Sequence, residues 1–449
     1  MQARYITILI TLLVVPLAFD YRADVDGQGH AIQYALVAPA LLSGILLALI
    51  GPRFKYRSKL RRIVSLSILL TIVGSIVPYI IQGNDADKYL RAVFPSLLFG
   101  IGYAVGCHPW GEKRAHAFEK WLFYSMALSS IGSVITGFAN GGTIDDVRYH
   151  IVSPTLLGFQ GYLLYRIVVL RHRTPLVLAF FALTLGIELF SVTRSLLIGT
   201  ILLFFLAAWI SASDATKFVS STIRTSAVAV ASFVLIGSVS TLLFPSVLDH
   251  WSQRIFYAQT TGGGKDPTTL SRLAELQNQY DQVTSDAPSL LFGKGYGHKF
   301  WYAEEYIQQL LAFAPREALE SQEGWSAGHN FWVYQFFVGG IFFGVALPAS
   351  LLYALYRCAA MYRRAKPDEK QLPYFREMGK YLMITAGMVV TTIGGNPLGP
   401  RYSGLIYGIA LGVLVSAYSR LVSLRRINNI QRSASNRLIE VRALSQLQR

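Results

Sequence analysis

The chain has 449 residues, of which 53% are hydrophobic and 15% are charged, and its formal net charge is +16. The apolar residues come in blocks, and a helix needs about 20 of them to cross a bilayer. This composition excludes a soluble enzyme, and the gathering of the positive charge in alternate loops marks a membrane protein rather than a nucleic-acid-binding one.

Twelve apolar blocks follow one another and predict an all-α integral membrane protein with about 12 transmembrane helices. The first block could instead be a signal peptide, but no A-x-A-like cleavage site follows it, so we expect a retained span. The blocks are 5–19, 31–50, 63–82, 90–107, 120–139, 151–170, 175–193, 195–210, 225–244, 329–356, 381–397 and 403–419. The expected parts of the chain are spans one to nine at 1–244, a large outer loop at 245–328, spans ten to twelve at 329–419 and a basic tail at 420–449.

Lys and Arg set the orientation, because cytoplasmic loops are enriched in them. With the N-terminus inside, the inner segments hold 29 of the 41 Lys and Arg residues and 7 of the 25 Asp and Glu residues. Both termini are then cytoplasmic, and the loop at 245–328 is outside. The inner basic stretches are expected to contact anionic membrane lipids. The two cysteines, Cys107 and Cys358, lie at cytoplasmic span ends and allow no disulfide framework outside.

The outer loop is long enough to have a function of its own. Apolar residues recur at helical spacing in 268–283 and 300–313, which predicts two helices. The second is rich in aromatic residues and is expected to lie at the membrane surface. Between them, the glycine-punctuated turn "LFGKGYGHKF" contains Gly295 and lacks the residue order of a P-loop.

Basic side chains are scarce on the outer side, so each one is a candidate. Arg194 lies at the tight turn between spans seven and eight, where a guanidinium is costly unless it is paired or faces water. It either belongs to a site or is a snorkelling arginine that ends a helix. Glu188, inside span seven, is either part of that site or the counter-ion of Arg194. Arg401 is the cation of the Gly- and Pro-rich last outer turn.

Arg272 opens the first predicted loop helix and shares a polar stripe with Glu275, Gln279 and Gln282. By itself it is a solvated surface residue or a substrate contact.

His329 and Asn330 precede span ten. A histidine there is either an interfacial residue or part of a site. Gly340 and Gly344, a GxxxG-type pair, predict that this span packs closely against another helix.

Two D-x-D pairs, Asp24 with Asp26 and Asp85 with Asp87, lie in outer loops. Metal-dependent membrane glycosyltransferases use such pairs, but acidic residues are expected in outer loops in any case. We therefore expect neither a metal nor another cofactor.

Three stretches, "FSVTRSLLIGTILLFF", "SRLAELQNQYDQV" with "LLFGKGYG", and "GHNFWVYQFFVGGIFFG", follow in order over about residues 180–350. Together they resemble the O-antigen ligase and polymerase superfamily of bacterial envelopes. The resemblance implies a GT-C-like bundle in the inner membrane, with its active site facing the periplasm and its large loop between spans nine and ten.

The resemblance also implies a metal-independent, inverting glycosyl transfer. The donor would be a glycan on undecaprenyl pyrophosphate, and the acceptor a sugar hydroxyl, on lipid A-core for a ligase of lipopolysaccharide biosynthesis or on the next repeat unit for a polymerase. Arg194 and Arg272 would hold the pyrophosphate, and His329 would activate the acceptor. The further expected substrate contacts are Arg401, Asn330, Glu188 and Gly295.

The chemistry of these residues agrees with that activity. Arginine is always charged and binds phosphate oxygens through two parallel hydrogen bonds. Histidine is the side chain suited to accept a proton near neutral pH. A secondary transporter is the more distant alternative, because Glu188 is an ionisable residue within a span, but the chain has no internal repeat and its polar groups gather at the outer face.

Overall fold

The computed structural model describes residues 2–22, 30–53, 55–139, 147–148, 150–212, 267–311, 316–319 and 324–447, with isolated positions between 213 and 266. Within this part the chain is helical, and its one extended pairing joins Phe300 to Trp325. The predicted all-α class is therefore confirmed for the described residues. Every predicted span falls on one or more helices except 225–244, which lies outside the described residues.

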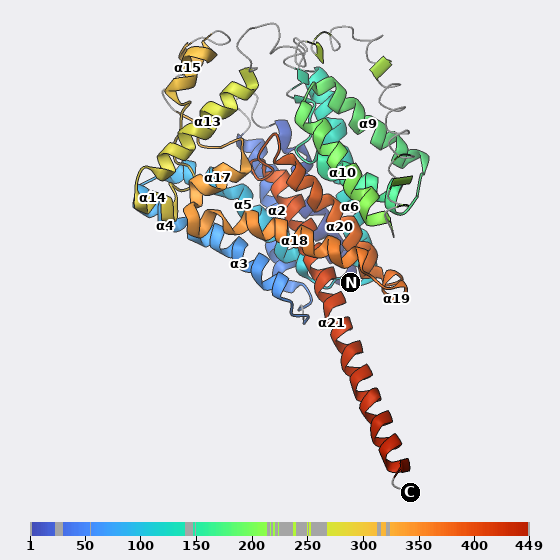
Figure 1. The fold of residues 1–449 in the computed structure, drawn as a ribbon. Helices are drawn as coiled ribbons and strands as arrows, with labels where there is room; N and C mark the ends of the chain where they lie inside the picture. The colour runs from blue at the N-terminus through green and yellow to red at the C-terminus, as the bar shows by residue number, and fades with distance from the viewer. Residues whose placement is uncertain are drawn as a thin grey trace.

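The N-terminal half forms most of the helical bundle (Figure 1). Its elements are α1 (Gln2–Val14), η1 (Pro16–Arg22), α2 (His30–Ile50), α3 (Lys59–Gly74), α4 (Ile76–Gln82), α5 (Ala86–Cys107), α6 (Glu112–Ala139), α8 (Leu156–Leu164), η2 (Tyr165–Val169), α9 (Pro175–Ser191) and α10 (Arg194–Ser211).

The outer loop and the C-terminal part follow. The loop contains α13 (Pro267–Thr284), α14 (Ala287–Phe292), α15 (Glu304–Leu310) and α16 (Arg316–Leu319). The C-terminal elements are α17 (Phe331–Gly339), η3 (Gly340–Gly344), α18 (Ala346–Arg363), α19 (Pro367–Lys370), α20 (Pro373–Thr391) and α21 (Arg401–Leu447).

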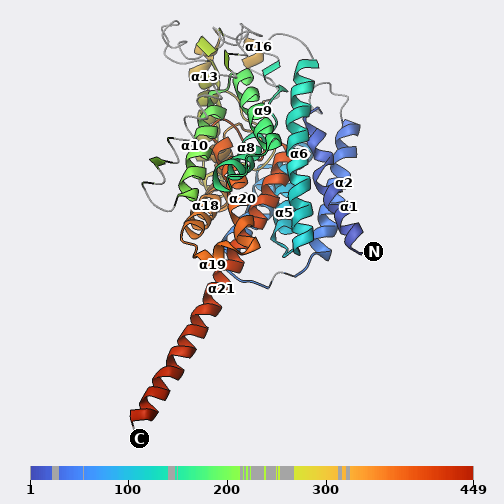
Figure 2. The ribbon, with the colours of Figure 1, turned by 90° about the vertical axis from the view of Figure 1, so that its right-hand side faces the viewer.

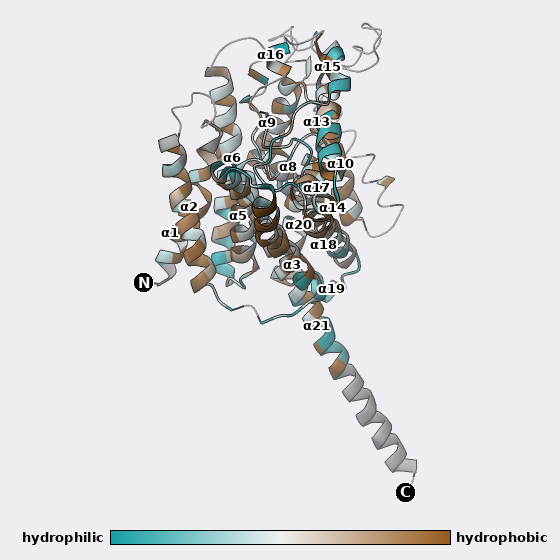
Figure 3. Ribbon diagram, turned by 90° about the vertical axis from the view of Figure 1, so that its left-hand side faces the viewer, coloured by the Kyte–Doolittle hydropathy of each residue, from teal (hydrophilic) through white to brown (hydrophobic). Residues whose placement is uncertain are grey.

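Five helices of the described part are long and apolar enough to cross a membrane, or six if α17 and α18 make one span. Their apolar residues form a band over the bundle (Figure 3). At the centre, α5 and α21 pack so closely that a Cβ on Gly102 or Gly106 would overlap the backbone of α21. Gly408 and Gly412 meet the backbone of α5 in the same way. Small residues at such a contact let two membrane helices approach.

The large loop and the two termini lie at opposite ends of the bundle (Figures 1 and 2). The helices α13, α15 and α16 stand at one end, and the N-terminus, α19 and the C-terminus at the other. The predicted topology requires this separation. We call the end with α13 the outer end.

The predicted span at 329–356 is broken in its middle. The chain bends by 86° between α17–η3 and α18. Gly340 has a left-handed backbone (φ 58°), which an L-residue adopts only at a cost. A Cβ there would lie 2.6 Å from the backbone of Leu291 and Gly293, and a Cβ on Gly344 would meet the carbonyl of Gln335 in α17. Gly340 thus lies at the bend and lets the end of α14 and the loop turn after it approach closely, as the spacing predicted, while Gly344 packs against α17 of its own segment.

Gly340→Ala should therefore destabilise the fold more than Gly83→Ala does. Gly83 has nearly the same backbone (φ 63°), but nothing lies within 4 Å of its Cβ position. Its substitution adds only the left-handed penalty of about 1–2 kcal/mol. At Gly340 an overpacking cost of about 1–3 kcal/mol is added. Unfolding midpoints in detergent measure both variants, and equal shifts would contradict the close approach at the bend.

The ends of two helices differ from the predicted boundaries. The basic tail at 420–449 is helical to Leu447 and continues α21 without a break. The aromatic residues at 300–302 precede α15 instead of belonging to it, and Ile307 and Leu310 of α15 are buried. Leu310 packs in a cluster with Leu270 and Ala274 of α13, so an apolar side of α15 faces this helix.

Candidate functional site

A carboxylate of α13 holds the histidine that precedes α17. The Oε2 atom of Glu275 lies 2.8 Å from Nδ1 of His329, and its Oε1 accepts a hydrogen bond of 2.6 Å from the His329 backbone N–H. The two residues are 54 positions apart in the chain. Glu275 fixes both the backbone and the ring of His329, so the imidazole has a defined orientation.

This contact also decides which ring nitrogen of His329 is reactive. A carboxylate only accepts hydrogen bonds, so Nδ1 carries the ring proton and its N–H group donates a hydrogen bond to Glu275. In the neutral ring, Nε2 then keeps its lone pair. The His329 side chain is 54% exposed, whereas that of Glu275 is 4% exposed. An exposed nitrogen base backed by a buried carboxylate is an arrangement that serves general-base catalysis.

Arg272 is part of the same group. Its Nη1 lies 3.6 Å from Oε2 of Glu275, one turn along α13, and its side chain is 37% exposed. Gln279, one turn further, donates from Nε2 to Oε1 of Glu275 at 3.2 Å. The buried carboxylate is therefore satisfied from several sides, which a charge needs when it leaves water. The predicted helix at 268–283 is confirmed, with Arg272 in its second turn.

Backbone contacts hold α13 beside the segment that leads to His329. Phe300 and Trp325 exchange two backbone hydrogen bonds of 2.9 Å, and the Ala303 N–H donates to the carbonyl of Ala274 in α13 at 3.1 Å. Trp301 N–H donates to the Asn278 side chain at 3.0 Å. The pairing of Glu275 with His329 thus rests on a small folded unit and not on a single contact.

Gly295 belongs to the scaffold of this unit. Its N–H donates to the carbonyl of Val338 at 3.1 Å, and the Lys294 N–H donates to that of Phe337 at 2.7 Å. These two bonds satisfy carbonyls at the end of α17, which a helix leaves free. Gly295 is buried with a left-handed backbone (φ 84°), so it has a structural role beside the bend. Its predicted contact with the substrate stays a prediction.

The other histidine of this region, His298, is unsuited to act as the base. Its Nδ1 lies 2.9 Å from Oδ1 of Asn84, and its ring packs on Phe337. Burial, together with the nearby positive charge of Lys294, lowers the pKa of His298 to about 4. The two histidines therefore differ: His298 joins the loop to the bundle, whereas Nε2 of His329 makes no hydrogen bond with the part of the chain that the structure describes.

Asn330 is the N-terminal cap of α17. Its Oδ1 accepts hydrogen bonds from the backbone N–H groups of Trp332 at 3.0 Å and Val333 at 3.1 Å. Asparagine is among the favoured residues for this position. The helix therefore begins at Phe331, and His329 is released from a capping role.

The last outer turn, which connects α20 to α21, contacts residues at the starts of α10 and α17. Asn396 donates from Nδ2 to the carbonyl of Gly328 at 3.2 Å, next to His329. A Cβ on Gly394 would overlap the side chain of Ser195, next to Arg194. Arg401 follows as the first residue of α21. The turn thus brings Arg194, Arg401 and His329 to the same end of the bundle, with Arg194 exposed and Arg401 half-buried.

Glu188 lies elsewhere. It is fully buried, and its Oε1 accepts from Nε2 of Gln160 at 2.9 Å and contacts the Thr200 hydroxyl. Glu188 lies in the interior packing of α8, α9 and α10, and its Oε2 is buried without a hydrogen-bond partner among the described residues. Its role as a substrate contact stays a prediction.

The second D-x-D pair has local partners. Asp85 caps α5 by accepting from the Asp87 N–H at 2.9 Å, and Asp87 pairs with Arg91 at 2.9 Å. Both carboxylates therefore have a structural role at the start of α5, Asp85 as its N-terminal cap and Asp87 in an ion pair. The first pair, Asp24 with Asp26, lies outside the described residues.

No protein-family model and no curated protein matches the chain. The candidate site is therefore defined by its own geometry. Its members are His329, Glu275 and Arg272, with Arg194 and Arg401 at the same end. Glu275 shares the polar stripe of Arg272 in the sequence, but nothing in the sequence pairs it with His329.

Proposed function

We propose that the protein is an O-antigen ligase-like glycosyltransferase that moves a glycan from a lipid-linked pyrophosphate to a sugar hydroxyl on the periplasmic side. The observation that carries the proposal is the contact of Glu275 with His329, because it provides an oriented base on an exposed surface next to Arg272. This is the combination that transfer from a phosphorylated donor needs.

The proposed step is one displacement at the anomeric carbon of the donor. Nε2 of His329 takes the proton of the acceptor hydroxyl, while the oxygen of that hydroxyl forms the new bond to the anomeric carbon. The bond from that carbon to the pyrophosphate oxygen breaks, and its electron pair leaves with undecaprenyl pyrophosphate. Attack opposite the leaving group inverts the anomeric configuration. Glu275 stabilises the imidazolium that forms.

The arginines would receive the charge that develops on the leaving group. Preorganised cations aimed at such charge are a large catalytic contribution. Arg272 is held toward the site by Glu275, and its side chain is exposed enough to reach a phosphate. Arg194 and Arg401 stand at the heads of α10 and α21, where the pyrophosphate of a donor anchored in the outer leaflet would lie.

We expect Arg194→Lys and Arg272→Lys each to lose most transfer activity, at least about tenfold, since lysine keeps the charge but loses the two parallel hydrogen bonds. Arg316→Lys, in α16 of the same loop, is the matched control. Transfer by the purified variants measures the effect. Normal activity of Arg272→Lys would make this residue a surface residue of α13.

A ligase and a polymerase would use the same chemical step and differ in their acceptor. Analysis of the envelope polysaccharide of a deletion strain tests this. Full-length glycan left on its lipid carrier is the result expected for a ligase. Single repeat units attached to the core would instead make the protein a polymerase, and an unchanged polysaccharide would contradict the proposal.

A further inference from the structure

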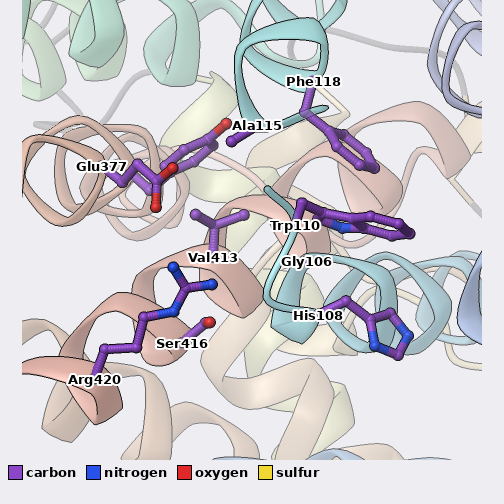
Figure 4. A pocket seen from close by; sticks show the side chains of 10 residues that line it. Gly106, His108, Trp110, Ala115, Phe118, Glu377, Val413, Ser416 and Arg420 are labelled. Atoms are coloured by element: carbon purple, nitrogen blue, oxygen red, sulfur yellow. The ribbon is translucent and has the colours of Figure 1, made fainter. Parts of the chain in front are cut away.

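Buried polar atoms without a hydrogen-bond partner occur at several places in the described part of the bundle. The Ser416 hydroxyl and Nε of Arg420 belong to residues that line a cavity beside the turn after α5, which has room for about one water (Figure 4). One water can account for both atoms. Oε2 of Glu188 differs from them, because it belongs to a fully buried ionisable group between α8, α9 and α10. Such a group is costly to bury in its charged form.

Three side chains form a closed ring around the other oxygen of Glu188. Nε2 of Gln160 in α8 lies 2.9 Å from Oε1 of Glu188 in α9, and the hydroxyl of Thr200 in α10 lies 2.5 Å from the same Oε1. The Thr200 hydroxyl is also 2.5 Å from Oε1 of Gln160. Each of the three side chains thus contacts the other two, and every contact is at hydrogen-bond distance.

The ring has three contacts but only two protons to place in them if Glu188 is ionised. Gln160 supplies an N–H group for one contact, and Thr200 has a single O–H group for one of its two. Turning the Gln160 amide over does not supply the third proton, because its N–H group then points at Thr200 and its oxygen at Glu188. In either orientation two oxygens face each other without a proton. A carboxylic acid at Glu188 provides the missing one.

The ring also joins the two helices that flank the turn carrying Arg194. Glu188 and Thr200 are each six residues from Arg194, one on either side of it. Within the turn, Val192 is fully buried and has a left-handed backbone (φ 49°). A β-branched residue keeps this strained conformation only where the surrounding contacts hold it. The ring is such a contact, because it ties α9 and α10 to each other and to α8.

We propose that Glu188 is a neutral carboxylic acid whose proton closes the ring, and that the closed ring positions the turn carrying Arg194. Glu188 donates to the Thr200 oxygen, Thr200 donates to Oε1 of Gln160, and Gln160 donates back to Glu188. Oε2 is then a carbonyl oxygen, which costs less to bury than a charged one. The positioning of Arg194 rests on the proposed function, whereas the protonation of Glu188 does not.

Infrared spectroscopy of the full chain in detergent near neutral pH tests the protonation without any substrate. The carbonyl stretch of a carboxylic acid is separate from the bands of carboxylates and peptide groups. We expect the wild type to show such a band and Glu188→Gln to lack it. Glu305→Gln, which removes an exposed carboxylate of α15, is the control and should keep it.

The Thr200 variants assign the band independently of Glu188→Gln. Thr200→Val removes the acceptor of the proton and should shift the band to higher frequency, while Thr200→Ser keeps the hydroxyl and should leave the band in place. A wild type without the band, or a band that neither Glu188→Gln nor Thr200→Val changes, would overturn the assignment.

A double variant tests the positioning of Arg194. Thr200→Val should lower transfer at least about tenfold, because a displaced Arg194 loses its two parallel hydrogen bonds to the donor. Thr200→Ser should transfer as the wild type does. In an Arg194→Lys background, Thr200→Val should have no further effect. Effects that multiply would overturn the positioning role. A wild type without transfer activity would instead contradict the proposed function, and the infrared result is independent of it.

Discussion

Replacing His329 with glutamine is expected to lower the rate of glycan transfer about 10²–10⁴-fold, the usual contribution of a general base. Glutamine has a similar reach and can still donate to Glu275, but it cannot accept the acceptor proton. The side chain is half exposed and Asn330 caps α17, so the variant should insert and fold as the wild type does. The lipid-linked donor should still bind.

The measurement is single-turnover transfer by purified protein, with donor binding followed separately. His150→Gln is the matched control, because His150 is also exposed and precedes a span. If His329→Gln transferred at a near-normal rate, His329 would only anchor the loop through its contact with Glu275.

Replacing Glu275 with glutamine is expected to lower kcat about 10²-fold with little change in the KM for the donor. The amide oxygen can still accept a hydrogen bond, but the charge that stabilises a protonated His329 is lost. In the Ser-His-Asp triad, the corresponding change lowers kcat about 10⁴-fold. A smaller effect is expected here because His329 is more than half exposed to water.

A double variant shows whether Glu275 acts through His329. Residues that work as a unit are not additive, so Glu275→Gln combined with His329→Gln should transfer no more slowly than His329→Gln alone. Glu304→Gln, an exposed carboxylate of α15, is the control for the loop. A double variant slowed by the product of both effects would give Glu275 a separate role, such as binding the acceptor.

Hydrophobic periodicity was enough to place the apolar helices and α13, since each is determined by residues close in sequence. The bend at Gly340 was not predictable in this way. Its apolar residues continue through the break, and the close approach of Leu291 and Gly293 to Gly340 is a contact between residues far apart in the sequence. A GxxxG spacing states that something comes close and does not say what.

The candidate site shows the same limit. His329 and Arg272 were recognisable because they are rare residue types at the outer end. Their shared partner Glu275 was not, because acidic residues are common in outer loops and the pairing spans 54 positions. Glu188 shows another limit: an ionisable residue in a span indicates a site, and here Gln160 and Thr200 contact its Oε1 inside the bundle, while its buried Oε2 makes no hydrogen bond with the described residues.

The most direct test of the account is transfer in proteoliposomes that contain purified protein, an undecaprenyl-pyrophosphate-linked glycan and a lipid A-core acceptor. The account predicts that the wild type forms the glycosylated acceptor with inverted anomeric configuration and releases undecaprenyl pyrophosphate, and that His329→Gln binds the donor without forming product. Two results would contradict it. One is that the wild type forms no product on this acceptor, either with this donor or with a second donor glycan. The other is full activity of His329→Gln.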